Sequence, residues 1–271
     1  MQTMNSTTLT RIAEALERLA PAPARADLAA FPAYHWSAGG LTGINRLDAM
    51  PLEVFAAIEI QKTALFENAR RLAAGAPAHD VLLWGARGMG KSALVRAVAA
   101  ELSLGLVQVD ADRIADLPEL FRLLDGAERA FLVFIDDLGI DEEASLRALR
   151  SVLDGGVEAR PDRCRLIVTS NRRHLVKRDL AENEAAASVN PRDTLDDKLA
   201  LAERFGLSLG FHACSQDDYL AICHSLAREV GVSIDDAAAI RFATQRGARS
   251  GRIARHYVTE VAGGTALTQV P

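Results

Sequence analysis

The stretch that decides the fold is Val81-Leu-Leu-Trp-Gly-Ala-Arg-Gly-Met-Gly-Lys-Ser92. It begins with a short apolar run, continues as a segment of the form G-x-x-x-x-G-K-[ST], and leads into residues 93–100, which are typical of a helix. In such a loop the glycines let backbone N–H groups point at phosphate oxygens, and the helix N-terminus adds the positive end of its dipole. The pattern predicts a phosphate-binding loop made of Gly85, Ala86, Arg87, Gly88, Met89, Gly90, Lys91, Ser92 and Ala93.

Two side chains of this loop carry specific expectations. We expect Lys91 to reach the β- and γ-phosphates of a nucleotide, and the Ser92 hydroxyl to ligate Mg²⁺. The strand before the loop and the helix after it make a glycine-rich turn with an uninvolved lysine the weaker interpretation. The loop therefore indicates a nucleotide-binding protein.

A second signal lies at the end of another apolar run. Residues 131–135 are apolar and are followed by Asp136 and Asp137. Because ligands of open α/β sheets bind at the carboxyl ends of the strands, we expect both carboxylates at the nucleotide site. Asp136 would hold the Mg²⁺ shell through water, and Asp137 would orient or polarise the attacking water.

A third signal has the same form. The apolar strand predicted at 165–169 is followed by Ser170 and Asn171. An asparagine often ends a strand only to make a turn, but here it follows two other phosphate-site motifs in order. We therefore expect Asn171 to hydrogen-bond the γ-phosphate or the attacking water.

Strands and helices alternate between residues 79 and 211. Continuous apolar strands that alternate with helices predict a parallel sheet covered by helices on both faces and joined by right-handed crossovers. Asp116, with Glu119 three residues later, predicts a helix N-terminal capping arrangement. The strands are predicted at 81–84, 104–109, 131–135, 165–169 and 207–211, and the helices at 54–72, 91–101, 116–125 and 142–153.

After residue 211 the pattern is helical only. Helices are predicted to begin at Ser215, Ser233 and Gly251, the first two with an aspartate three residues later. This pattern predicts a small helical unit that follows an α/β domain. The predicted division is an α/β nucleotide-binding domain at 51–211, a helical lid at 212–262 and a tail at 263–271.

The first 50 residues are predicted to be an N-terminal helix and an irregular connector. Leucine and isoleucine side chains at 9, 12, 16 and 19 have helical spacing, and prolines at 21 and 23 end the run. The connector, 31–50, contains Tyr34, His35 and Trp36. We expect these aromatic side chains to pack in the protein rather than to contact an adenine or a sugar.

Composition excludes several classes of protein. The net charge of −5 argues against a general binder of polyanions. The three cysteines are far apart and lack C-x-x-C pairing, which predicts a reducing compartment without a zinc site or a disulfide framework. No apolar run is long enough to cross a membrane and no signal pattern opens the chain, so we expect a cytoplasmic protein without a membrane partner.

The glycine loop, the Asp-Asp strand end, the Thr-Ser-Asn strand end and the C-terminal helices, in this order, resemble the AAA+ ATPases. The stretches VLLWGARGMGKS, FIDDLG, LRSVLDGGVEARPDRC, TSNRRHLV and LAERFGLSLGFHACSQDDYL resemble more narrowly one bacterial family of uncharacterised AAA+ ATP-binding proteins, over about residues 50–262. The resemblance implies an α/β P-loop NTPase fold with a five-stranded parallel sheet, a helical AAA+ lid, and ATP with Mg²⁺ as ligands.

The resemblance also implies roles for two arginines. Residues 199–206 resemble the segment that carries the arginine finger, so Arg204 is the candidate to act on a neighbouring subunit's γ-phosphate, in a homo-oligomer. Residues 250–252 resemble the start of the lid helix whose arginine touches the nucleotide. Arg252 is the candidate for that residue, with Arg249 as its rival.

One departure from the AAA+ pattern bears on the reaction. Most members have Asp-Glu where this chain has Asp136-Asp137, and the aspartate is one methylene shorter. Its carboxylate would therefore stand farther from the attacking water, and we expect slow hydrolysis unless Glu142 or Glu143 compensates. Slow hydrolysis suits a switch better than a continuously cycling motor.

Together the motifs predict an ATPase that couples its nucleotide state to a conformational change or to the remodelling of an unidentified protein client. A first alternative is a nucleic-acid remodelling accessory similar to the helicase loaders, which would use basic clusters at 172–178 and 241–255. This alternative is less favoured, because solvated faces, nucleotide contacts and subunit contacts explain the same charges without a nucleic acid. A second alternative is a nucleotide-dependent switch that does not hydrolyse ATP.

Overall fold

The computed structural model describes residues 11, 27–138, 143–155, 159–171 and 202–264. The predicted N-terminal helix lies almost entirely outside these residues, as do Glu142, the side chain of Glu143 and the basic cluster at 172–178. Within the described residues no helix is both long and apolar enough to cross a membrane.

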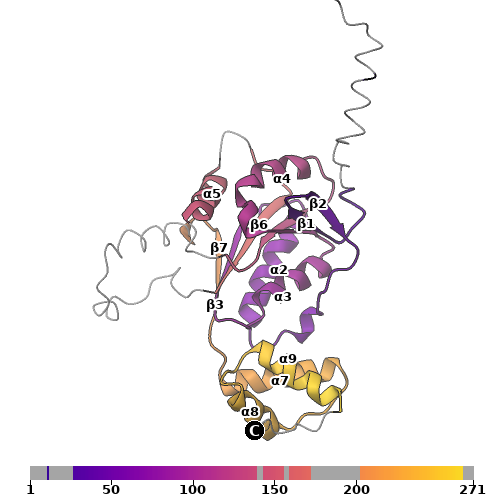
Figure 1. Ribbon diagram of the computed structural model, residues 1–271, viewed down its shortest axis with the longest axis vertical. Helices are drawn as coiled ribbons and strands as arrows, with labels where there is room; N and C mark the ends of the chain where they lie inside the picture. Colours follow the sequence, from indigo (N-terminus) through magenta and orange to yellow (C-terminus); the bar gives the residue numbers. More distant parts are fainter. Residues whose placement is uncertain (1–10, 12–26, 139–142, 156–158, 172–201, 265–271) are drawn as a thin grey trace, which may run out of the picture.

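A seven-stranded sheet forms the centre of the protein, in the order β2-β1-β4-β5-β6-β3-β7 (Figure 1). All neighbouring pairs are parallel except β1 and β2, which are antiparallel. The strands are β1 (Ala33–Ser37), β2 (Gly40–Ile44), β3 (Val81–Gly85), β4 (Gly105–Val109), β5 (Phe131–Ile135), β6 (Cys164–Ser170) and β7 (Leu207–Phe211).

The helices lie close to the predicted ranges. The helix expected at 54–72 begins later, at Glu59, and residues 52–54 form a separate short turn. The elements are η1 (Leu52–Val54), α2 (Glu59–Ala73), α3 (Lys91–Glu101), η2 (Ala111–Asp116), α4 (Leu117–Leu124), α5 (Glu143–Asp154), α7 (Gln216–Glu229), α8 (Asp236–Gln245) and α9 (Gly251–Ala262).

Helices cover both faces of the sheet, as predicted. Successive side chains of a strand point to opposite faces, so Leu83 of β3 packs with α2 and α3 whereas Leu82 packs with α4 and α5. The first of these two apolar clusters continues into α7, α8 and α9, which lie together below the sheet in Figure 1. The core thus joins the sheet to the C-terminal helices.

The prediction of five strands and an irregular connector at 31–50 is wrong. Residues 33–44 form the β1–β2 hairpin, with Gly40 at a φ of +89° in its turn, and β1 extends the sheet beside β4. Tyr34 and Trp36 are buried by the sheet, so the expectation that they pack is confirmed. The guanidinium of Arg129 stabilises this edge by donating to the carbonyls of Phe31 (2.7 Å) and Leu104 (2.8 Å).

Two of the three predicted helix caps differ in the structure. The capping box of Ser215 and Asp218 is present. Asp116 makes no side-chain cap, because its carboxylate pairs with Arg113 at 2.6 Å. Helix α8 is capped by Asp235 rather than Ser233, with the Asp235 carboxylate accepting from the Ala238 N–H at 2.8 Å.

A buried asparagine of α2 holds the chain where it enters β3. Asn68 is 3% exposed, donates to the His79 carbonyl and accepts from the His79 N–H, both at 2.9 Å. Residue 79 precedes β3 and has no strand partner in the described part of the chain for its backbone N–H and carbonyl, and the Asn68 side chain takes that place. They set the start of β3, and β3 leads directly into the glycine loop.

We predict that Asn68→Ala lowers the free energy of unfolding by about 2 kcal/mol, because two backbone groups lose their partners. Urea denaturation followed by circular dichroism measures this change. Asn45→Ala, at an exposed position, is the matched control and should change it by less than about 0.5 kcal/mol. Equal losses in the two variants would contradict the structural role of Asn68.

Candidate nucleotide-binding site

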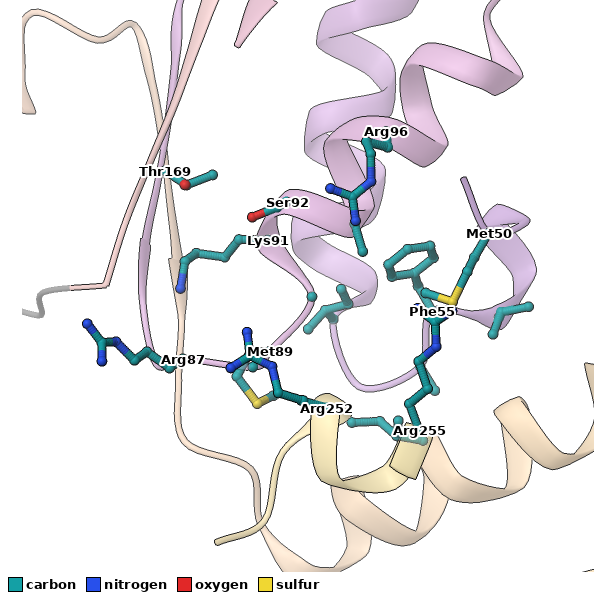
Figure 2. A pocket seen from close by; sticks show the side chains of 18 of the residues that line it. Met50, Phe55, Arg87, Met89, Lys91, Ser92, Arg96, Thr169, Arg252 and Arg255 are labelled. Atoms are coloured by element: carbon teal, nitrogen blue, oxygen red, sulfur yellow. The ribbon is translucent and has the colours of Figure 1, made fainter. Parts of the chain in front are cut away.

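A cavity of about 450 Å³ lies at the carboxyl edge of the sheet, between the glycine loop and the C-terminal helices (Figure 2). One end is lined by residues 87–93 of the loop with Asp136, Asp137, Thr169 and Asn171. The other end is lined mainly by apolar side chains from residues 50–58 and from α7. The three sequence motifs therefore meet at one site.

The glycine loop depends on backbone conformations that glycine adopts most readily. Gly85 has a φ of +115°, and a Cβ atom there would lie 2.1 Å from the Phe211 carbonyl oxygen. That oxygen accepts from the Ala86 N–H at 2.7 Å, so the loop turns directly against the end of β7. Gly90, at a φ of +90°, caps α3, which begins at Lys91.

The Lys91 ammonium group lies in a cage of oxygen atoms. It donates to the carbonyls of Gly85 and Ala86, both at 2.9 Å, and to Asn171 Oδ1 at 3.1 Å. Burial lowers the pKa of Lys91, while the nearby Asp137 and Asp136 carboxylates oppose that shift. The side chain is 6% exposed, and its three present acceptors could be exchanged for phosphate oxygens.

Two hydroxyl groups, from Ser92 and Thr169, donate to the same carboxylate oxygen of Asp136. The hydroxyls of Ser92 and Thr169 both donate to Asp136 Oδ1 at 2.6 Å. The Thr169 oxygen also accepts from the Asp137 N–H at 2.7 Å, so one side chain of β6 orients both aspartates after β5. A hydroxyl and a carboxylate oxygen side by side are hard donors that fit Mg²⁺.

Asp137 has a left-handed backbone, with a φ of +52°. Aspartate and asparagine adopt this conformation more readily than longer side chains do, which gives a physical reason for aspartate rather than glutamate here. Asn171 connects Asp137 to Lys91: its amide nitrogen donates to Asp137 Oδ1 while its oxygen accepts from the ammonium. The orientation of this amide is therefore set by one anion and one cation.

Of the two candidate arginines at the start of the last helix, Arg252 is the one that lies at the cavity. Arg252 lines the cavity whereas Arg249 does not, and the Arg252 N–H donates to the Gly88 carbonyl at 3.1 Å. Ser250 caps α9 by accepting from the Ile253 N–H at 3.3 Å, so the first turn of this helix rests on the glycine loop.

Arg204 lies elsewhere. It is not among the residues that line the cavity, and its guanidinium pairs with Asp154 at the end of α5. The structure thus brings together every other predicted site residue that it describes, while a role of Arg204 at a neighbouring subunit stays a prediction.

The sequence analysis missed the apolar end of the cavity and two further arginines. The missed apolar residues include Met50, Phe55 and Ile222, and the missed arginines are Arg96 and Arg255. The Ser225 hydroxyl of α7 donates to the Val54 carbonyl at 2.9 Å and holds the two walls together. The apolar residues within 50–58 follow neither a helical nor a strand period. Only their position before the glycine loop could have indicated a binding role.

Thr169 provides a test of how the acidic end is built. We predict that Thr169→Val lowers the free energy of unfolding by about 2 kcal/mol, because Asp136 loses a donor and the Asp137 N–H loses its acceptor. Thr169→Ser retains the hydroxyl and should cost about 1 kcal/mol, for the lost methyl group. Urea denaturation of both variants measures the difference, and a serine variant as unstable as the valine variant would contradict the hydrogen-bonding role.

Comparisons with solved structures agree with this architecture. The RuvB Holliday junction branch migration motor of Thermotoga maritima is similar over 80% of this chain and 65% of its own, at 22% identity and a TM-score of 0.55. The AAA domain of FIGL-1, solved in complex with ADP, is similar over 81% of this chain and 75% of its own, at 20% identity and a TM-score of 0.51. The chain thus spans less than two thirds of the length of the RuvB chain. The likeness shows the AAA+ P-loop fold.

No curated protein matches the chain. A protein family does match it, over residues 29–265, and its description is "Protein of unknown function (DUF815)". This match covers the whole sheet, the glycine loop and all three C-terminal helices. The chain therefore belongs to the DUF815 family and has the fold of an AAA+ P-loop ATPase.

Proposed function

We propose that the protein binds ATP with Mg²⁺ in this cavity, hydrolyses it, and uses the change of nucleotide state to remodel a protein partner. One observation carries the proposal. A continuous hydrogen-bonded set, Lys91–Asn171–Asp137 and Ser92–Asp136–Thr169, stands at one end of a cavity whose other end is apolar. This arrangement provides for a polyphosphate at one end and a base at the other.

Each group has a chemical role in the proposed reaction. Lys91 and Arg252 would bind phosphate oxygens, and Asn171 and Asp137 would orient the attacking water. Ser92 and Asp136 would hold Mg²⁺, which when bound neutralises negative charge on the phosphates. FIGL-1, whose AAA domain binds ADP, supports adenine as the base at the apolar end.

The contacts of the C-terminal helices support a coupling between nucleotide and lid. We take 212–262 as the lid: it touches the glycine loop through Arg252 and residues 52–54 through Ser225. Loss or gain of the γ-phosphate beside Arg252 would therefore change the interactions that set the lid angle. A protein client that binds the lid would be switched by this change. As the composition predicts, the proposed compartment is the cytoplasm.

Phosphate release from Mg·ATP is the first measurement. Lys91→Ala should weaken ATP binding by at least about 100-fold, because the buried cation is the main phosphate ligand of the loop. Asp137→Asn should retain binding and the left-handed backbone, yet release phosphate at least about 100-fold more slowly, because the carboxylate is lost. Tight ATP binding without phosphate release in the wild type would leave the nucleotide-dependent switch as the function.

The dependence of specific ATPase activity on protein concentration tests whether the active site needs a neighbouring subunit. If Arg204 of a neighbouring subunit acts on the γ-phosphate, specific activity rises with concentration, and Arg204→Ala removes this rise. Asp154→Ala is the matched control, because it removes the same ion pair but keeps the arginine. Specific activity that does not depend on concentration would contradict a finger supplied by another subunit.

The nucleic-acid accessory is the less favoured candidate. The RuvB motor acts on Holliday junctions, but two lid arginines of this chain, Arg241 and Arg246, lie close to Asp235 and Glu260. Carboxylates beside these guanidiniums reduce the positive potential that DNA phosphates would meet. Stimulation of phosphate release by single-stranded DNA would reverse this preference.

A further inference from the structure

We propose that Arg87, from the glycine loop itself, binds the γ-phosphate of the nucleotide in its own chain and stabilises the transition state of hydrolysis. The inference rests on the proposed ATP site and adds to it a catalytic arginine that needs no neighbouring subunit. The reasons are the place of Arg87 in the glycine loop, the cavity that it lines with Lys91 and Arg252, and the lack of a partner for its guanidinium among the residues that the structure describes.

The backbone places Arg87 beside the phosphate-binding lysine. The Lys91 ammonium contacts the carbonyls of Gly85 and Ala86, which are the two residues immediately before Arg87. Arg87 lines the cavity together with Lys91 and Arg252. In Figure 2 the Arg87 and Arg252 side chains lie on opposite sides of the end of Lys91. A γ-phosphate bound by Lys91 would therefore lie within this group of three cations.

The electrostatics agree with this placement. Arg87, Lys91 and Arg252 line the same cavity, so their like charges face one space. The two carboxylates at this end already accept hydrogen bonds from Ser92, Thr169 and Asn171. The group of cations therefore has an excess of positive charge, which an anionic phosphate would balance.

Arg87 is exposed, and among the described residues no hydrogen bond, ion pair or aromatic contact holds its guanidinium. Two other arginines, by contrast, have hydrogen-bond or ion-pair partners. Arg96, which also lines the cavity, donates to the Asp48 carbonyl at 3.0 Å, and Arg204 pairs with Asp154. Arg87 can thus reach a phosphate without first breaking a contact of its own.

The chemistry requires such a group. The water oxygen forms a bond to the γ-phosphorus while the bond to the β–γ bridging oxygen breaks, and that oxygen leaves with the electron pair as part of ADP. Asp137 takes the proton of the water. Negative charge spreads over the three outer oxygens in the transition state, and a planar guanidinium binds two of them at once.

The experiment compares Arg87→Ala and Arg87→Lys with Arg228→Ala, a matched control at an exposed position on α7. All are made in the Arg204→Ala protein, so that no neighbour's finger contributes. Phosphate release at saturating Mg·ATP, and the dissociation constants of ATP, ADP and ADP–tetrafluoroaluminate, are measured for each.

We expect Arg87→Ala to slow phosphate release by about 100-fold or more and to weaken ADP–tetrafluoroaluminate binding equally, with ADP binding unchanged. Arg87→Lys should recover little, because an ammonium cannot bind two oxygens in the same plane. Arg228→Ala should match its parent protein. Release and analogue binding within about threefold of the parent in Arg87→Ala would overturn the proposal.

The outcomes separate this proposal from that of ATP hydrolysis. If the Arg204→Ala parent binds nucleotide but releases no phosphate, the ratio of ATP affinity to ADP affinity decides the role of Arg87, and phosphate release by the wild-type protein decides whether the proposal of hydrolysis fails. A fall of that ratio by about tenfold in Arg87→Ala supports a γ-phosphate contact, and an unchanged ratio overturns it. If the wild-type protein binds no nucleotide at all, both proposals are overturned.

Discussion

The site depends on one buried cation. The Lys91 ammonium has little access to water, and such a charge is stable only where oxygen atoms surround it. Two carbonyls at the end of β3 and an amide oxygen at the end of β6 supply them. Because Asn171 also contacts Asp137, the cation connects the ends of three adjacent strands. A displacement of β3 or β6 would therefore remove acceptors of the lysine, and a displacement of β5 would remove the carboxylate that orients Asn171.

A second constraint joins the site to the C-terminal helices. A Cβ atom on Gly88 would lie 2.9 Å from the Ser250 hydroxyl oxygen, so a larger residue at position 88 would displace the start of α9, and the φ of +75° there also favours glycine. At the apolar end, the Ser225 hydroxyl of α7 donates a hydrogen bond to the carbonyl of residue 54. Since the lid contacts both ends of the cavity, a ligand that fills it acts on the lid at two points.

Much of the fold could be predicted from the sequence, because it follows from local patterns. The strands β5 and β7 and the helix α3 have the predicted ranges, and the glycine loop connects β3 to α3 as its motif indicates. The hairpin of β1 and β2 was missed because only Ala33, Tyr34 and Trp36 of it are buried, and its place in the sheet depends on pairing with β4, which is far away in the sequence. The Asp116 cap failed for a similar reason, since Arg113 competes for the same carboxylate.

The sequence by itself predicted a phosphate and Mg²⁺ site at the glycine loop and the two polar strand ends, because G-x-x-x-x-G-K-[ST] and these strand ends have few other uses in this order. Only the tertiary structure decided how these residues are supported. Thr169 became part of the site because it lies on the strand beside β5, and Arg252 rather than Arg249 because the first turn of α9 rests on Gly88. Nor does any local signal show that Arg87 has no partner among the described residues. Whether a charged side chain finds a partner depends on residues far away along the chain, which only folding brings near.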